Sequence, residues 1–149
     1  MRKFSFERSK AWQAAADLAV AVYRLLERLP AIERYGLESQ LRRSIHSVPS
    51  NIAEGSGRAT GRDQAHYSTI AYGSLVESLN HLLLAERHGY LSAADIDPLR
   101  PQFSKVATHL SALRRYQLKS DGLNAQLAQE PPPDDYATYP NDYVLPPLD

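Results

Sequence analysis

The sequence predicts an all-α protein, an antiparallel up-down four-helix bundle followed by an extended acidic tail rich in proline and tyrosine. Two observations predict the bundle: apolar residues recur every three or four positions in four segments, and short connections containing Gly or Pro separate these segments. A third predicts the tail, because all 17 basic residues lie at or before Lys119, whereas six acidic residues and six of the ten prolines follow it. We therefore divide the chain into a bundle, residues 1–119, and a tail, residues 120–149.

Length and composition narrow the class of protein. A chain of 149 residues without cysteine can bury its own core, and it is not a disulfide mini-protein, a thiol enzyme or a cysteine-ligated metal protein. No apolar run reaches the roughly eighteen residues that a membrane span requires. Gln13, Asp17 and Arg24 interrupt the segment that follows the basic N-terminus, which is not typical of a signal peptide. We expect a cytoplasmic protein that contacts no membrane.

The first helix is predicted from Ser9 to Arg28. It carries two adjacent apolar rows, the first with Trp12, Ala15, Ala19, Val22 and Leu26, the second with Ala14, Leu18, Ala21 and Leu25. Two rows cover more of the circumference than one core-facing stripe needs. The pattern predicts either an intersubunit contact or a helix buried deeply in its own bundle.

The second helix is predicted from Ile32 to Gly55, with an apolar row formed by Leu37, Leu41, Ile45, Val48 and Ile52. Pro49 lies inside this helix and removes one backbone hydrogen bond, so we expect a kink near residues 45–49 and not a break. The glycines at positions 55 and 57 end the helix.

The third helix is predicted to begin after Thr60, whose spacing to Asp63 is that of a capping box, and to end at His88 before Gly89. Its expected core row is Tyr67, Ile70 or Ala71, Leu75, Leu79, and Leu82 or Leu83. The fourth helix has a coiled-coil-like seam of Ile96, Leu99, Phe103, Val106, Leu110 and Leu113. Because of Pro98 and Pro101, regular helix is expected only from about Arg100, with residues 92–96 in a separate turn.

A second, polar stripe follows the second helix at intervals of three and four, formed by Gln40, Arg43, Ser47, Asn51 and Glu54. The third helix offers Glu77, Asn80 and His81. The stripe is either a polar pocket or recognition surface, or a solvated face or intersubunit ion-pair network. We expect Asn51 and Glu54 to act structurally, by bonding to Arg43, Arg58 or a neighbouring subunit.

The patterns of enzyme and metal sites are not met. The five histidines include no Glu-x-x-His, the bundle di-iron signature, and no strand precedes the glycines at 55, 57 and 61 as a phosphate loop would require. Ser44, Ser47 and Ser50 have no base and orienting acid in a recognised arrangement. We predict no catalytic residue, no metal site and no cofactor.

Residues 35–55 contain the run Ser-Val-Pro-Ser-Asn-Ile-Ala-Glu-Gly, residues 70–77 read Ile-Ala-Tyr-Gly-Ser-Leu-Val-Glu, and residues 12–15 read Trp-Gln-x-Ala. These motifs resemble those of the four-helix-bundle ribosomal RNA intervening-sequence proteins, which are related to the accessory variability determinants of diversity-generating retroelements. The resemblance spans about residues 4–116. It implies a ring-shaped homopentamer without an established catalytic activity. The positions that match the family's polar motif residues, and for which it implies assembly or ligand contact, are Arg43, Asn51, Glu54, Arg58 and Glu77.

Three functions follow as hypotheses. The first is a non-enzymatic homo-oligomeric scaffold or adaptor whose partner is itself. The second is a nucleic-acid-binding accessory factor that contacts RNA or DNA through Arg42, Arg58 and Arg62. The third is a small-molecule or enzyme site in the polar stripe.

The tail has its own prediction. Tyr136, Tyr139 and Tyr143 are spaced so that an extended chain can place their rings in grooves of the bundle or of a neighbouring subunit, while its carboxylates meet basic residues. The alternative is a disordered, solubilising extension, which this composition often indicates.

Overall fold

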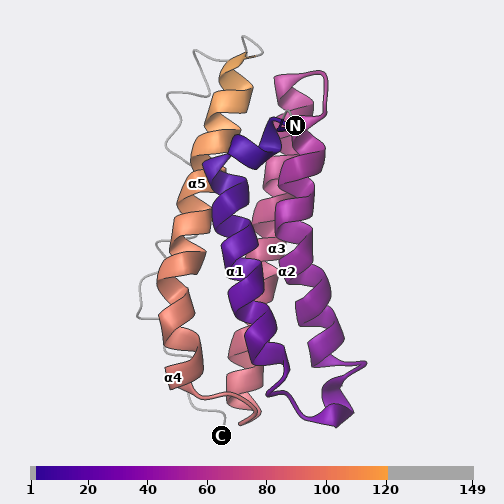
Figure 1. Ribbon diagram of the computed structural model, residues 1–149, viewed down its shortest axis with the longest axis vertical. Coiled ribbons are helices and arrows are strands. Elements are labelled where there is room, and N and C mark those ends of the chain that lie inside the picture. The colour runs from indigo at the N-terminus through magenta and orange to yellow at the C-terminus, as the bar shows by residue number, and fades with distance from the viewer. Residues whose placement is uncertain (1–2, 121–149) are drawn as a thin grey trace, which may run out of the picture.

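The computed structural model describes residues 3–120, which fold into a four-helix bundle as predicted (Figure 1). Residues 121–149, with Tyr136, Tyr139 and Tyr143, lie outside the described residues. The four long helices are α1 (Lys10–Leu26), α2 (Leu37–Ser56), α3 (Gly61–Arg87) and α5 (Arg100–Ser120). The short elements are the 3-10 turns η1 (Phe6–Arg8), η2 (Ala31–Glu33) and η3 (Asp97–Leu99), and the helical turn α4 (Ala93–Ile96).

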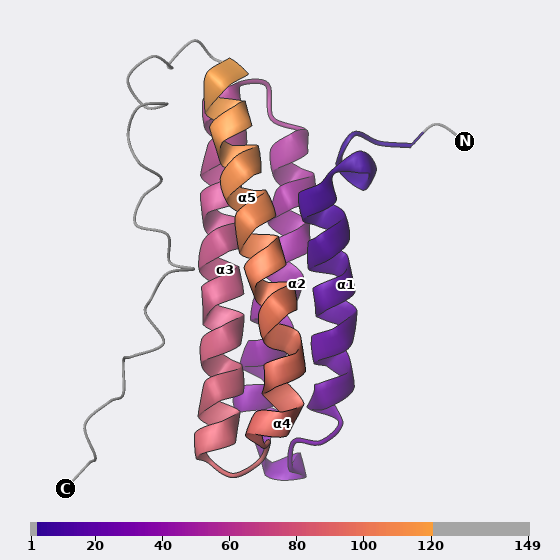
Figure 2. The same ribbon diagram turned by 90° about the vertical axis from the view of Figure 1, so that its left-hand side faces the viewer.

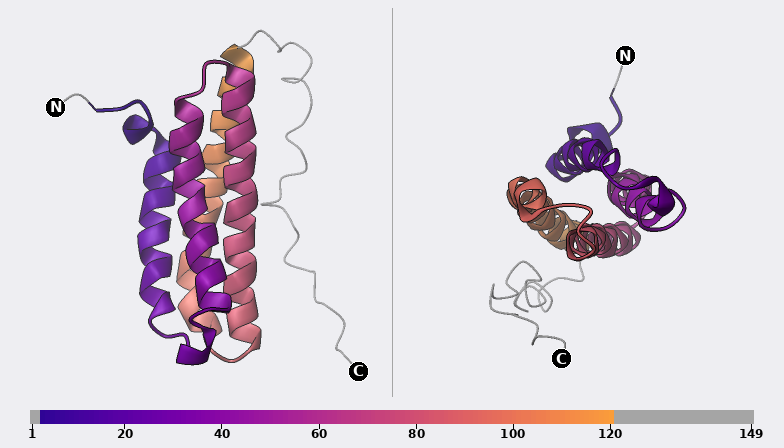
Figure 3. Two further views of the ribbon diagram at one scale, coloured as in Figure 1. Left: turned by 90° about the vertical axis from the view of Figure 1, so that its right-hand side faces the viewer. Right: turned by 90° about the horizontal axis from the view of Figure 1, so that it is seen from below.

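The helices follow one another around the bundle in the order α1, α2, α3, α5, each antiparallel to the last (Figure 2). Each packs on its two neighbours, and the end-on view in Figure 3 places α1 and α3 at diagonally opposite corners. The start of α1, the α2–α3 turn and the end of α5 therefore lie at the same end of the bundle. None of the helices within residues 3–120 combines the length and the apolar character that crossing a bilayer requires.

Side-chain and glycine caps set the helix ends where the sequence predicts them. The Ser9 side chain accepts a hydrogen bond from the Trp12 N–H at the start of α1, and the Thr60 hydroxyl accepts one from the Asp63 N–H at the start of α3. The chain leaves α3 through Gly89, whose φ of 74° is left-handed. The N–H groups at positions 89 and 90 then donate back to the carbonyls at 86 and 85, which satisfies the last turn of the helix.

The sequence predicted that the second helix begins at Ile32, but the helix begins at Leu37. Residues 31–33 form a 3-10 turn instead, and Ile32 is 84% exposed. The carboxylate of Glu33 accepts the Leu37 N–H at 2.9 Å, which fixes the start of α2 after this turn. Pro49 lies inside an unbroken α2, and α5 begins at Arg100, as expected.

The turn before α5 is held by Asp95, whose carboxylate accepts the N–H and the hydroxyl of Ser92 and pairs with Arg28 from the end of α1. These contacts, the Ser92 backbone first, lower the pKa of Asp95.

The core draws on all four long helices. Its largest fully buried side chains include Leu18, Leu41, Ile45, Leu82, Ile96 and Leu110. Both apolar rows of α1 turn inward: Ala15 and Leu18, one from each row, are completely buried, and among the large apolar residues of α1 only Val20 is exposed, at 57%. Of the two interpretations of the first helix, deep burial in its own bundle is therefore the one that the structure shows.

The core row of α3 resolves two alternatives of the sequence. Ala71 and Leu82 are completely buried, whereas Ile70 is 39% exposed and Leu83 is half-buried. The buried face of α3 also includes Ser68, Ser74 and Ser78, so much of this helix packs through small side chains.

We predict opposite effects for two glycine substitutions in α3. Gly61 faces α5, where an added Cβ would overlap the carbonyl oxygen of Gln117, whereas an added Cβ at Gly73 would meet no atom within 4 Å. Gly61→Ala should lower the free energy of unfolding by about 1–3 kcal/mol through overpacking. The matched control, Gly73→Ala, should raise it by about 0.5–1 kcal/mol, because alanine is the better helix former. Urea denaturation measures both, and unchanged stability of Gly61→Ala would contradict the close α3–α5 contact.

Candidate functional site

The polar stripe of the second helix meets polar side chains of α3 along the outside of the α2–α3 contact. We call this surface the α2–α3 polar belt, and it consists of Arg43, Ser47, Asn51, Glu54, Arg58, Tyr67, Ser74, Glu77 and His81. Arg58 comes from the turn that follows α2, so the belt extends from mid-bundle to the end where the two helices are joined.

Small side chains beneath the belt let α2 and α3 approach closely. The Ser78 hydroxyl donates to the Ser74 carbonyl at 2.8 Å, and its oxygen lies 2.9 Å from Ser44 Oγ on α2. Ser44 and Ser78 are at most 2% exposed. Nearer the α2–α3 turn, a Cβ added at Gly55 would lie 2.8 Å from Cβ of Tyr67, which explains a glycine there. Ser44 and Ser78 therefore form a hydrogen bond between α2 and α3 in a buried contact, which we call the buried seam.

One part of the belt is an exposed ionic cluster. Glu77 lies 3.7 Å from the Arg43 guanidinium and 3.4 Å from His81 Nε2, and Arg43 also donates to Gln40 at 2.8 Å. The side chains of Arg43 and Glu77 are 74% and 42% exposed, so water screens their attraction and the pair adds little to stability. His81 is largely covered, and its Nδ1 has no hydrogen-bond partner within residues 3–120.

The middle of the belt is a hydrogen-bond chain between the helices. Asn51 Nδ2 donates to the carbonyl and to the hydroxyl oxygen of Ser47, at 2.8 Å each, and the Ser47 hydroxyl oxygen accepts from Ser74 at 2.9 Å. The expectation that Asn51 bonds to Arg43 or Arg58 is therefore wrong within the chain. Its amide reaches only one turn back along α2, which a spacing of four residues makes the nearer contact.

The end of the belt near the α2–α3 turn is built around Arg58. Its guanidinium donates to the Glu54 carboxylate and to the Tyr67 hydroxyl, and its Cζ lies 4.4 Å from the centre of the Tyr67 ring. Partial burial, followed by the hydrogen bond to Glu54, raises the pKa of the Tyr67 phenol. Glu54 and Arg58 thus form the pair that the sequence predicted.

The polar belt satisfies most of its hydrogen bonds internally. Its charged groups face outward on one side of the bundle, which suits contact with a protein surface better than chemistry on an enclosed substrate. Within the part of the chain that the structure describes, no three His, Asp or Glu side chains gather as metal ligands would.

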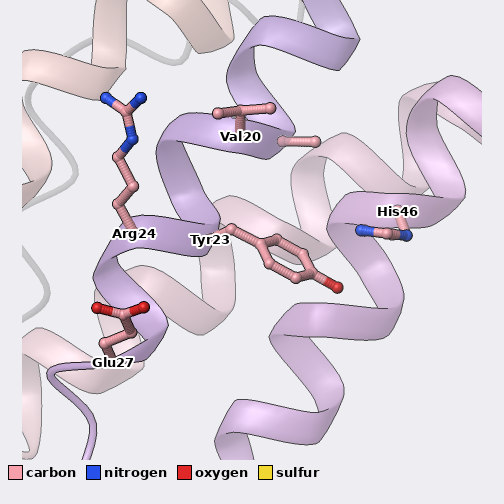
Figure 4. A pocket seen from close by; sticks show the side chains of 6 residues that line it. Val20, Tyr23, Arg24, Glu27 and His46 are labelled. Carbon is pink, nitrogen blue, oxygen red and sulfur yellow. The ribbon is translucent and has the colours of Figure 1, made fainter.

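A groove lies on the other side of α2, and the sequence analysis did not single it out. This α1–α2 groove has a volume of about 380 Å³ and is lined by Ala19, Val20, Tyr23, Arg24, Glu27 and His46. Figure 4 shows Tyr23 pointing from α1 toward His46 on α2, and their ring centres lie 4.7 Å apart. Arg42 lies over the Tyr23 ring at 4.7 Å and pairs with Glu38. The signal in the sequence was the pair of Val20 and Tyr23, which lie about one turn apart on the first helix and outside both apolar rows.

The net charge of the described residues is concentrated at one end of the bundle. We call this end the basic pole, formed by the start of α1, the α2–α3 turn and the last two turns of α5 (Figure 1). It has three acidic residues, Glu7, Glu54 and Asp63, and eight basic ones, Lys3, Arg8, Lys10, Arg58, Arg62, Arg114, Arg115 and Lys119, which gives +5. The rest of residues 3–120 contains eight basic and eight acidic residues, and its net charge is zero.

Five cations of the basic pole, Lys3, Arg8, Lys10, Arg115 and Lys119, are exposed and form no ion pair with another residue in the range 3–120. Two aromatic side chains, Phe4 and Tyr116, are 69% and 71% exposed at this end. The Phe4 ring stacks on Phe6, which packs edge-on against Trp12. Of the predicted nucleic-acid contacts, Arg58 and Arg62 belong to the pole, whereas Arg42 lies apart from it, over the Tyr23 ring between α1 and α2.

Comparison with known families gives one match. The family model for the 23S rRNA-intervening sequence protein matches residues 7–112, which is more than half of the chain and includes α1, α2, α3 and most of α5. No curated protein matches the chain at a significant level.

The contacts of Asn51 and Glu54 predict that replacing either residue by alanine lowers the free energy of unfolding by a small amount, and by more for Asn51. Asn51→Ala should lower the free energy of unfolding by about 0.5–1.5 kcal/mol, because it breaks hydrogen bonds in a half-buried chain. Glu54→Ala should cost less than about 1 kcal/mol, since the Glu54 side chain is 54% exposed. Ser50→Ala, an exposed position on the same helix, should stay within about 0.5 kcal/mol of the wild type. Denaturant titration compares them, and a larger loss for Glu54→Ala than for Asn51→Ala would contradict this order.

Proposed function

Because the chain belongs to the family of 23S rRNA-intervening sequence proteins, we propose that it is a cytoplasmic, non-enzymatic, homo-oligomeric scaffold or adaptor. Its motifs resemble those of relatives that form ring-shaped homopentamers, and of the accessory variability determinants of diversity-generating retroelements. The homopentamer is the assembly that we propose on this resemblance. The support from the structure is the distribution of its exposed apolar side chains.

The observation that carries the proposal is an uncovered apolar face on α3. Ile70, Val76 and Leu84 are 39%, 46% and 38% exposed, and the space above Gly73 is open. These side chains are spread over about 120° of the helix surface, with Glu77 and Asn80 between them, and such a mixture of apolar and polar groups is typical of a protein–protein interface.

A second apolar patch lies on the diagonally opposite helix. Val20 on α1 is 57% exposed and lines the concave α1–α2 groove together with Ala19 and Tyr23. Two different patches on opposite sides of one subunit favour head-to-tail contacts, which close into a ring when the rotation between neighbours permits. A two-fold interface alone would give only a dimer.

The polar belt fits the same arrangement. It lies along the edge of the α3 face, where Arg43 and Glu77 remain partly exposed and able to contact a neighbouring subunit. Such polar pairs at the rim of an interface contribute to its register more than to its strength. Because the belt's groups bond mainly to one another and its charged side chains are exposed, we propose assembly and not catalysis as their role.

We expect Ile70→Glu with Val76→Glu to dissociate the oligomer, because two carboxylates would be buried in an apolar contact. Light scattering at micromolar concentrations should give an oligomer for the wild type and a smaller mass for this variant. The matched control, Ser104→Glu on the exposed side of α5, should keep the wild-type mass. A monomeric wild type, or a variant of unchanged mass, overturns the proposed assembly surface.

A second candidate, a nucleic-acid-binding accessory factor, is favoured by the basic pole. Unpaired cations next to exposed aromatic rings are what single-stranded nucleic acid binds, because phosphates pair with the cations and bases stack on the rings. Arg58 and Arg62 belong to this surface. In a ring whose subunits point the same way, the poles would form one continuous basic surface.

Charge reversal tests this candidate. The starting protein is the full chain with the six tail acids replaced by Asn or Gln, which removes their repulsion of RNA. A triple variant of this protein carries Lys10→Glu, Arg115→Glu and Lys119→Glu. It should bind a labelled single-stranded RNA more weakly. The slope of the logarithm of its binding constant against the logarithm of salt concentration should be less steep by about 2, at roughly 0.7 for each lost phosphate contact. Fluorescence anisotropy at several salt concentrations measures both quantities.

The matched control reverses three exposed cations outside the pole, through Arg34→Glu, Arg87→Glu and Lys105→Glu. It changes the net charge equally but should retain more of the affinity, since these positions lie more than a Debye length of about 10 Å from the bound strand. Equal losses in the two triple variants, or no binding by the starting protein, would eliminate the nucleic-acid candidate.

A further inference from the structure

We propose that the acidic tail beyond Ser120, residues 121–149, docks on the basic pole of its own chain as an intramolecular mimic of single-stranded nucleic acid. The inference goes beyond the proposed scaffold function, because it needs neither assembly nor RNA binding. It rests on the charges and aromatic side chains of the pole, on the place where α5 ends, and on the composition of the segment that follows.

Charge complementarity is the first argument. The basic pole carries +5, and five of its cations have no ion-pair partner within residues 3–120. The tail contains six carboxylates, Asp121, Glu130, Asp134, Asp135, Asp142 and Asp149, and no basic residue. The N-termini of α1 and α3 and the C-termini of α2 and α5 meet at this end, so their dipoles largely cancel and the field comes from side chains.

Covalent attachment is the second argument. The described part of α5 reaches Ser120 within the basic pole, so the segment that follows starts at the surface that attracts it. Attachment raises the effective concentration of the tail there, and the short closure distance keeps the entropic cost low. The opposite end of α5 lies about 30 Å away, beyond the reach of screened charges, and the bundle outside the pole has no net charge.

The third argument is that the tyrosine side chains of the tail can stack on the exposed aromatic side chains of the basic pole. Tyr136, Tyr139 and Tyr143 lie close to the carboxylates of positions 134, 135 and 142, so that one segment carries both rings and negative charges, as a nucleic-acid strand does. Phe4 and Tyr116 offer exposed rings for stacking, and the bundle already places an arginine over a tyrosine twice, at Arg58 and at Arg42. The six prolines restrict the free tail and so reduce the entropy that docking costs.

Docking makes the tail a competitor of polyanions. Its carboxylates and rings occupy the surface that RNA or DNA would need, and the competition weakens as salt screens the contact. The full chain is therefore held in a state of low affinity for nucleic acid, which a partner that captures the tail would release.

The chain suits a direct test, because it has one tryptophan, Trp12 at the basic pole, and no cysteine. We place a single label site in the full-length tail with Ala137→Cys and attach a dansyl acceptor. Energy transfer from Trp12 to the label should be high at low salt and fall as salt is added. Adding Lys10→Glu, Arg115→Glu and Lys119→Glu should lower the low-salt transfer to the high-salt value, whereas the control triple of Arg34→Glu, Arg87→Glu and Lys105→Glu should not.

A second variant keeps the test independent of damage to the bundle. Replacing the six tail acids by Asn or Gln leaves residues 3–120 untouched and should cause the same loss of transfer, with unchanged helical circular dichroism. Low-salt transfer that neither this variant nor the pole triple reduces would overturn the proposal. Dilution of the labelled chain with excess unlabelled chain should leave the transfer unchanged, and a decrease would overturn docking on the tail's own chain.

Discussion

The close packing of α2 on α3 through small side chains determines the geometry of most other features of the molecule. Ser44 and Ser78 meet in the buried seam, and Gly55 allows the start of α3 to approach the end of α2. Since these residues occupy the inner positions, larger polar groups such as Arg43 and Glu77 are displaced to the outer edge of the contact. Because Ala71 and Leu75 occupy the inward positions of α3, the helical repeat turns their neighbours Ile70 and Val76 away from the core. Both the polar belt and the apolar face of α3 thus result from one helix contact.

The second organising feature is the separation of charge along the bundle. Pairs such as Arg28 with Asp95 and Arg100 with Asp97 balance the far end, where the connections between helices carry acids beside arginines. At the basic pole the connections carry few acids, and cations such as Arg115 and Lys119 form no ion pair with another residue of the range 3–120. A net neutral chain therefore presents a strongly polarised surface, and electrostatic attraction acts at one end of it.

These two features make the proposed roles compatible with one another. The proposed assembly would use the sides of the bundle, at α1 and α3, whereas the proposed anion binding would use its end. A head-to-tail ring leaves the ends of its subunits free and brings equivalent ends together when the subunits point the same way. A surface of this kind can be regulated by its own acidic segment without disturbing the contacts that hold the ring.

The sequence by itself determined the all-α class, the four long helices and most of their ends, because periodicity, Thr60 and Gly89 act through local geometry. It also predicted the Glu54–Arg58 pair, whose partners lie one turn apart. Only the tertiary structure decided what depends on packing between helices. It placed Ala71 inside and Ile70 outside, although the two are neighbours in one apolar run, and it showed that both rows of α1 face the chain's own core. It also gathered the basic pole from three separate segments, because spatial neighbours on different helices leave no periodic signal along the chain.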